Sequence, residues 1–518
     1  MSGSLWMPPG SRPDTLPYSP TLGFARAGGP PSRQRTPSWA QPDPVDELAE
    51  RLDDVIAAAV HPDEIAAVLE SDGLSDDQIR ERYGVKNSFA LAEELYERVE
   101  RRYPEPDGPL HDPWQIGLLG CLLRGVVFAL PGFGYVLGAP LLAGPEGDLG
   151  LPAGTVPLLA GALCGWTWNQ GLAHRAYSWL GLGDRLAARR SLLLGAPAGA
   201  LLGALIALAV AGTAHPAAIV FAAGQSGYLG AATVLLVMGR ERALLIALLP
   251  MAAGAAVTVA QPVPDAARLA LLLGSLAVVG VLALREVAPA LRDLGEGGNW
   301  TAGLTALLPF GTFGPVPEHR RTAAPRLAAS LPYALFGLGS GVLVVYGALG
   351  DVLAGEEQSA IAAPAAVALT LSMGPAEWLL YRFRSGGLAG LRSSSTPKAF
   401  LRTTARTVVQ CLTGYLASLL ALSLATSALW PHAQGLTGVR LAGLLLLGVV
   451  LWTGLLLQSF GAVTGAAAVC CAAALAQTAA LVTHTGDPHW VGLIVYGTAA
   501  VIQAGLVCAL LGRATAHR

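Results

Sequence analysis

One arginine lies inside an apolar segment, where a charged side chain is costly. Arg124 follows Trp114 by ten residues in the first long apolar run, so a helix would carry it about 15 Å into a bilayer at 1.5 Å per residue. A charge near the bilayer centre costs several kcal/mol unless it faces a partner or a water-filled cavity. The position allows two interpretations: a structural pair with a buried carbonyl or acid, or a site that binds an anion.

One carboxylate also lies well inside an apolar run. Glu377 precedes Arg382 by five residues and Arg384 by seven. It can pair with one of these arginines at the membrane interface, or it can couple a cation or contact cargo. Gln225 is one of several glutamines within apolar runs, most of which we expect to hydrogen-bond between helices. Arg124, Gln225 and Glu377 are the candidate cargo-binding residues.

A polar cluster ends the second apolar run. Asn169, Gln170, His174 and Arg175 lie within one short stretch of sequence. Such a cluster suits a gate at the cytoplasmic end of a transport path, and it also suits a solvated membrane interface. Asn169, His174 and Arg175 are therefore the candidate cytoplasmic gate residues.

The sequence lacks the motifs of nucleotide or hydrolytic chemistry. It contains no GxxxxGK[ST], HExxH or GxSxG pattern, so it shows no ATPase or hydrolase machinery. The six cysteines fall in apolar runs without a CxxC pair, which favours packing over disulfides or a metal site. We expect no cofactor and no bound metal, and a coupling cation is left open.

The composition indicates a membrane protein. Hydrophobic residues make up 53% of the chain, charged residues 13%, and the mean hydropathy is +0.51, against roughly 25% charged residues in soluble domains. Twelve apolar runs are each close to the ~20 residues that cross a bilayer as a helix. The predicted spans are 115–137, 151–172, 191–212, 216–238, 243–261, 267–287, 327–349, 359–381, 405–428, 438–460, 463–483 and 489–511.

Arginine is concentrated in every second loop. Arg185, Arg240, Arg292 and Arg402 stand in the connections after the second, fourth, sixth and eighth spans, and the intervening loops hold almost no cations. Cytoplasmic loops carry such an excess, so both termini are predicted to be cytoplasmic. The exits of spans two and eight share aromatic, arginine and glycine residues. This likeness indicates two six-span halves related by an axis along the membrane normal, with cargo between them.

The predicted fold is an all-α polytopic membrane protein. It has about twelve transmembrane helices in two six-helix bundles, plus a small helical cytoplasmic N-terminal domain. The expected divisions are a disordered tail rich in Pro, Ser and Arg at 1–42, an acidic domain at 43–103, a first half at 104–287, an inter-half loop at 288–326 and a second half at 327–518.

The acidic domain at 43–103 holds 17 acidic and seven basic side chains. Pro62 suits the first turn of a helix, Ser75 and Gln78 match a capping box, and Asn87 can cap a further helix. Three short helices are therefore predicted. They form either a packed module or a docking site for a cytoplasmic protein partner, and nothing in the charge suggests nucleic acid.

Two motifs resemble those of multidrug, oligosaccharidyl-lipid and polysaccharide exporters. The first outer loop, from Leu142 to Gly150, is similar to their LGPExxG signature, and the stretch from Pro375 to Arg406 is similar to their eighth helix and following loop. The resemblance implies two six-helix bundles around a cavity that opens alternately to each side. For flippases of lipid-linked glycans it implies a cationic cavity for the diphosphate of the cargo, which Arg124 fits. The acidic domain is not a usual feature of that family.

The expected function is translocation of a lipid-linked glycan or another cell-envelope polymer precursor across the bacterial plasma membrane. The partners would be the anionic lipid-linked cargo, membrane lipids and a cytoplasmic protein at residues 43–103. Two alternatives stay open. Glu146 and Asp148 in the first outer loop suit a membrane glycosyltransferase that uses polyprenyl-phosphate sugars, and residues 43–103 suit a scaffold that does not transport.

Overall fold

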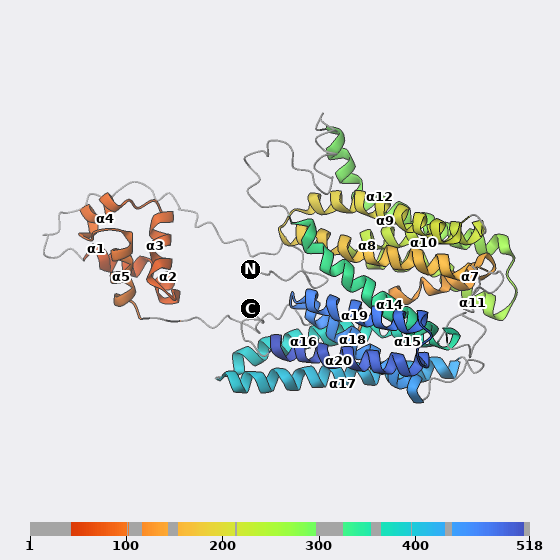
Figure 1. Cartoon of the computed structure of the whole chain (residues 1–518). Coiled ribbons are helices and arrows are strands. Elements are labelled where there is room, and N and C mark those ends of the chain that lie inside the picture. The colour runs from red at the N-terminus through yellow and green to blue at the C-terminus, as the bar shows by residue number, and fades with distance from the viewer. Residues whose placement is uncertain are drawn as a thin grey trace. The chain divides into compact units, whose positions relative to one another are not determined.

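The computed structural model describes residues 43–100, 102, 117–142, 154–212, 215–296, 325–353, 364–394, 396–429 and 438–511. Every regular element within these ranges is helical, which confirms the predicted all-α class (Figure 1). The chain folds as two compact units, with residues 16–112 in one and the membrane helices, from residue 113 onward, in the other. The tail at 1–42, most of the inter-half loop and the outer loop with Glu146 and Asp148 lie outside the described residues.

The acidic unit contains five short helices within its described part. They are α1 (Pro44–Arg51), α2 (Asp53–Ala58), α3 (Pro62–Ser71), α4 (Asp76–Tyr83) and α5 (Ser88–Arg98). Ser75 and Gln78 form a complete capping box on α4, and the Asn87 side chain accepts a hydrogen bond from the Ala90 N–H on α5. The prediction of three helices omitted α1, although Asp43 and Pro44 are a local start signal for it, and α2, which has no side-chain cap.

The acidic unit has its own apolar core. Ile56, Ile65, Leu69, Leu91 and Leu95 are completely buried within it. The core therefore draws on α2, α3 and α5, and the acidic side chains are left on the surface of a packed module.

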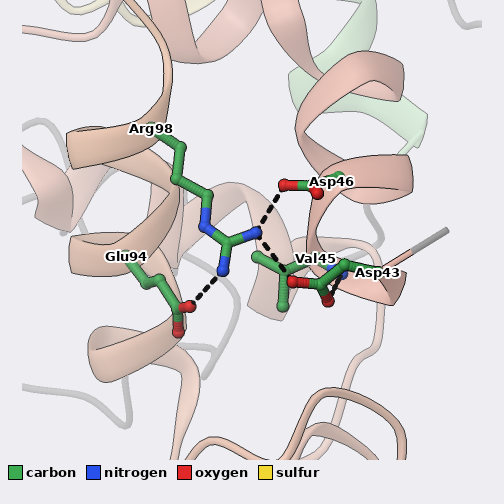
Figure 2. A network of polar contacts seen from close by, with 5 residues as sticks. All are labelled: Asp43, Val45, Asp46, Glu94 and Arg98. Carbon is green, nitrogen blue, oxygen red and sulfur yellow. Dashed lines mark hydrogen bonds and ion pairs between the residues drawn. The ribbon is translucent and has the colours of Figure 1, made fainter.

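Arg98 at the end of α5 ties the last helix of this unit to the first (Figure 2). Its guanidinium donates to Asp43 at 3.0 Å, to Asp46 at 2.5 Å and to Glu94 at 2.7 Å. Asp43 also accepts from the Val45 N–H at 3.0 Å and so caps α1. The Val45 N–H and the Arg98 guanidinium together lower the pKa of Asp43.

The membrane unit contains one helical segment for each predicted span, among the residues described. The segments are α6 (Leu118–Ala129) with α7 (Gly132–Leu142), α8 (Thr155–Gly181), α9 (Arg185–Ala211), α10 (Pro216–Val237), α11 (Glu241–Ala260), α12 (Asp265–Glu296), η3 (Leu327–Ser330) with α14 (Leu331–Leu353), α15 (Pro364–Leu371) with α16 (Met373–Ser393), α17 (Pro397–Leu429), α18 (Gly438–Ser459), α19 (Val463–Val482) and α20 (Pro488–Leu511).

Two of these segments are interrupted near a proline. In the first, α6 ends at Ala129 and α7 begins after Pro131. In the eighth, α15 ends at Leu371, whose carbonyl would have accepted from residue 375 in a continuous helix. Pro375 has no N–H to donate, so the helix breaks there.

Ten helical segments in the described part are long and apolar enough to cross a membrane. The chain is thus a multi-pass membrane protein. The two predicted spans outside this set are α8 and the broken segment α15–α16. These two carry polar side chains, including Asn169 and Glu377, and both pack against the opposite half of the molecule.

The two groups of six segments pack in the same way. In both halves the first segment contacts the fifth and sixth, the second contacts the third, and the fourth contacts the sixth. Each half has a separate apolar core, one within 127–287 and one within 333–511. Figure 1 shows α8, α9, α10 and α12 on one side of the unit and α16 to α20 on the other. This repeated pattern of contacts fits the predicted two-bundle fold.

The halves meet through two reciprocal helix contacts. Segment one (α6) packs against segment eight (α15–α16), and segment two (α8) packs against segment seven (η3–α14). At the first contact, a Cβ added at Gly125 would lie 2.9 Å from the Gly374 nitrogen, and one added at Gly374 would lie 2.8 Å from the Cys121 carbonyl oxygen. Glycine is required at both positions because the two backbones touch.

Candidate functional site

Arg124 forms ion pairs that join the two halves. Its guanidinium contacts Glu377 on α16 of the second half, and it contacts Glu241 at the start of α11 of the first half at 2.5 Å. The side chains of Arg124 and Glu377 are 12% and 8% exposed. We call Arg124, Glu241 and Glu377 the inter-half ion cluster.

The ion cluster lies beside the close crossing of α6 and α16. Gly125 and Gly374 bring the backbones together, so the adjacent Arg124 can reach across to Glu377. The Tyr381 hydroxyl, one turn along α16, donates to the same Glu377 oxygen at 3.1 Å. A buried charge pair is stable only when further hydrogen bonds satisfy its oxygens, and Tyr381 supplies one.

The position of Arg124 differs from the predicted depth. It lies six residues after the start of α6, about 9 Å along the helix axis, because α6 begins later than the predicted span. The cluster is therefore closer to the end of the unit that the arginine distribution places in the cytoplasm. Glu241 agrees with this location, since it follows the second arginine-rich loop.

Of the alternatives left open for Glu377, pairing with Arg382 or Arg384 is not what its described contacts show. Arg382 stacks over the Trp378 ring at 5.4 Å, and Arg384 donates to the Ser459 carbonyl on α18. Glu377 instead pairs with Arg124. Of the two interpretations of Arg124, the structure shows the pair with a buried acid.

His174 lies at the second contact between the halves. Its Nδ1 is 2.9 Å from the Ser330 hydroxyl, and its ring stacks on Tyr333 with centroids 3.8 Å apart. A Cβ added at Gly171 would lie 3.3 Å from the Ala334 side chain. This contact also lies at the predicted cytoplasmic end, seven residues before the end of α8.

The other polar residues predicted at this end differ in their surroundings. Asn169 is buried and its Oδ1 has no hydrogen-bond partner among the described residues, and the same holds for one terminal nitrogen of Arg175. The structure therefore places Asn169, His174 and Arg175 on the helix that contacts the second half. Burial argues against a fully solvated interface for Asn169 and His174.

Gln225 belongs to a different contact. Its amide nitrogen donates to the Tyr135 hydroxyl at 2.8 Å, which links α10 to α7 within the first half. Its Oε1 is buried without a partner among the residues described. The structure thus brings two of the three predicted cargo residues, Arg124 and Glu377, into one cluster and places Gln225 outside it.

Neither a metal cluster nor a disulfide is found in the described part of the chain. No group of three or more His, Cys, Asp or Glu side chains there could hold a metal ion. All six cysteines are free thiols.

Comparisons with known proteins gave a match in structure and none in sequence. No family model and no curated protein matches the chain. A solved structure described as the outward-facing conformation of a multidrug resistance MATE family transporter of the MOP superfamily aligns with it at 14% sequence identity and a TM-score of 0.44. The alignment covers 78% of this chain and 97% of that one.

Proposed function

We propose that this protein translocates a lipid-linked glycan, or another phosphate-bearing precursor of a cell-envelope polymer, across the bacterial plasma membrane by alternating access. One observation supports the proposal above the others: a largely buried arginine of the first half is paired with a buried carboxylate of the second. The contact of α6 with α16 lies at Gly125 and Gly374, and that of α8 with α14 runs from Gly171 to Leu163, so both include positions toward the predicted cytoplasmic end. Separating the halves at that end would open a path from the cytoplasm.

The ion cluster can act as a switch between gate and cargo site. Parting the halves removes Glu377 from Arg124 and leaves the guanidinium facing the opening. Arginine binds phosphate oxygens through the same paired N–H donors that bind a carboxylate. At an effective dielectric near 20, two opposite unit charges 4 Å apart attract by about 4 kcal/mol. The cargo phosphate and Glu377 would therefore compete for Arg124 with similar interaction energies. Closing the gate would then displace the phosphate.

The net negative charge of the inter-half ion cluster would allow a coupling cation to bind there. Two carboxylates share one arginine, so the cluster carries an excess negative charge. When Arg124 turns to cargo, Glu241 and Glu377 lose their shared partner. A proton or a metal cation could neutralise them at that step, because an unpaired carboxylate is costly in a partly desolvated site.

The test measures export by variants of Arg124. Arg124→Lys keeps the charge without the bidentate fork and should retain part of the transport, whereas Arg124→Ala should lose most of it. The measurement is the amount of lipid-linked glycan at the outer face, divided by the amount of folded protein in the membrane. The control is Arg292→Ala, which removes an exposed arginine at the end of α12 and should leave export unchanged. Normal export by folded Arg124→Ala would refute the cargo role.

A further inference from the structure

Three cationic side chains are aligned along the first turns of α17 in the second half. They are Lys398, Arg402 and Arg406, which follow one another at intervals of four residues. Residues four apart are neighbours on a helix surface, so the three cations share one face over about 12 Å of the helix axis. All three are exposed. We call these three residues the α17 cation stripe.

The α17 cation stripe faces away from the helices that α17 packs against. Thr403 and Thr407 define the packed face. A Cβ added at Gly386 of α16 would lie 3.0 Å from the Thr407 side chain, and one added at Gly390 would lie 3.3 Å from that of Thr403. Cys411, one turn further along the same face, is buried. Only 22% of the membrane-crossing window of α17 is buried inside the unit, so the stripe meets the surroundings of the protein.

The charges of the α17 cation stripe are not neutralised within the described part of the chain. None of the three side chains has an ion pair, a hydrogen bond or a ring contact there. The sequence from 378 to 486 contains no Asp or Glu, and Glu377 belongs to the inter-half ion cluster. In the first half, by contrast, Arg240 at the same end of the helices is paired with Glu286 at 2.6 Å.

The α17 cation stripe lies where the charged part of the helix meets the uncharged part. The 33 residues of α17 extend over about 50 Å, which exceeds the ~30 Å of hydrocarbon in a bilayer. Residues 407–429 carry no charged side chain and are long enough to cross the hydrocarbon. The cations therefore stand at the level of the lipid headgroups. Val409 follows Arg402 by seven residues, so it continues the same face, and it is 62% exposed.

We propose that the α17 cation stripe binds the phosphate groups of anionic phospholipids in the membrane leaflet that it faces. Clusters of Lys and Arg beside a membrane-crossing helix attract anionic lipids. The acyl chains would then lie along the exposed apolar face that begins at Val409. Two features favour a lipid over a soluble anion: the depth of the stripe and its continuation into an apolar surface. The inference does not depend on the proposed transport.

Membrane topology alone does not explain this arrangement. The excess of Lys and Arg that sets topology is counted over a loop and the adjacent helix ends. It requires neither a shared helix face nor the absence of partners. On α9, the third segment of the first half, Arg185 is exposed whereas Arg189 and Arg190 are half-buried. The aligned, exposed cations are therefore a feature of α17 rather than of every arginine-rich helix end.

The test is native mass spectrometry of the purified full-length protein in detergent, titrated with phosphatidylglycerol or phosphatidylcholine that carry the same acyl chains. Phosphatidylglycerol should bind saturably and at least about tenfold more tightly, because only its headgroup has a net negative charge. Inorganic phosphate at the same concentration should not displace it, since free phosphate has no acyl chain to cover the apolar face. Equal binding of the two lipids, or displacement by inorganic phosphate, would overturn the proposal.

Two variants with the same change in net charge complete the test. The stripe variant replaces all three cations: Lys398→Gln, Arg402→Gln and Arg406→Gln. The control variant replaces one exposed arginine on each of α9, α11 and α12: Arg185→Gln, Arg242→Gln and Arg292→Gln. The stripe variant should bind phosphatidylglycerol about tenfold or more weakly and phosphatidylcholine as before, and the control variant should change neither by more than about twofold.

Thermal unfolding in detergent verifies that both variants are folded. An equal loss of phosphatidylglycerol binding in the two variants would show an effect of total charge rather than a site on α17. Undiminished binding by the folded stripe variant would likewise contradict the proposal.

Discussion

Arg124 and Glu377 are 253 positions apart in the sequence, and no local spacing connects them. Each residue lies in an apolar run, where a charged side chain needs a partner. Each of the two is the partner of the other. Their pairing depends on how the halves pack, which composition and periodicity do not reveal. Glu241 was missed because it precedes the predicted fifth span by two residues and therefore counted as part of a loop.

The first prediction concerns the stability of the ion cluster. Arg124→Leu leaves two buried or half-buried carboxylates without their cation, so it should destabilise the folded protein by roughly 3–5 kcal/mol. Arg124→Leu combined with Glu377→Leu removes both charges of the closest pair and should recover a large part of that loss. Thermal unfolding of the purified variants measures the effect. A double variant no more stable than Arg124→Leu alone would show that the pair is not the stabilising contact.

A second prediction concerns Arg98 in the acidic unit. Because the pKa of Asp43 is lowered in the folded protein, its contribution to stability is complete above the ordinary Asp value of about 3.9. That contribution is lost as the pH falls below this value and through the lower folded pKa. Hydrogen exchange of the α1 amides in the full-length protein should therefore accelerate under acid, beyond the intrinsic change in rate.

The control for Arg98 is a second exposed arginine in the same unit. Arg98→Met should accelerate exchange in α1 at neutral pH and remove its acid dependence. Arg80 pairs with Asp77 of its own helix, so Arg80→Met should leave α1 unchanged. Equal effects of the two substitutions on α1 would contradict the link between α5 and α1.

Two helix starts in the acidic unit were predicted from local capping signals. The capping box of α4 and the cap of α5 follow from Ser75 and Asn87. The break before Met373 was not predicted, because proline alone does not decide it: Pro197 and Pro250 lie inside unbroken helices. The twelve apolar runs each became a helical segment. The helix α2 has no side-chain cap and was not predicted, whereas α1 was overlooked although Asp43 and Pro44 mark its start.

The crossing of α6 and α16 gives a prediction with a matched control in the same helix. Gly125→Val would push a side chain into the Gly374 backbone, whereas a Cβ at Gly120 meets nothing within 4 Å. Overpacking of this kind typically costs about 1–3 kcal/mol. Thermal unfolding should show a loss for Gly125→Val and little change for Gly120→Val. Equal stability of the two variants would show that the helices can separate there without cost.

At the scale of the whole molecule, the loop sequences predicted more of the architecture than the apolar runs did. The alternation of arginine indicated which loops are cytoplasmic, and the likeness of the exits of spans two and eight indicated two six-span halves. The helices of the two halves pack in equivalent pairs. The same repeat explains why the two contacts between the halves are reciprocal: α6 meets α15–α16, the counterpart of α8, and α8 meets α14, the counterpart of α6. The sequence could not predict which end of the halves would touch, since both ends are compatible with the same spans and loops.

The most direct test of closure at the cytoplasmic end is a distance between the halves. Spin labels at Leu182→Cys, after α8, and Lys398→Cys, at the start of α17, stand at exposed positions in the first and second halves. With the native cysteines replaced by alanine, pulsed electron paramagnetic resonance should give one dominant short distance. Adding Arg124→Gln should shift population to a longer distance, and adding Arg292→Gln should not. Identical distance distributions with and without Arg124→Gln would contradict a gate held by Arg124 and Glu377.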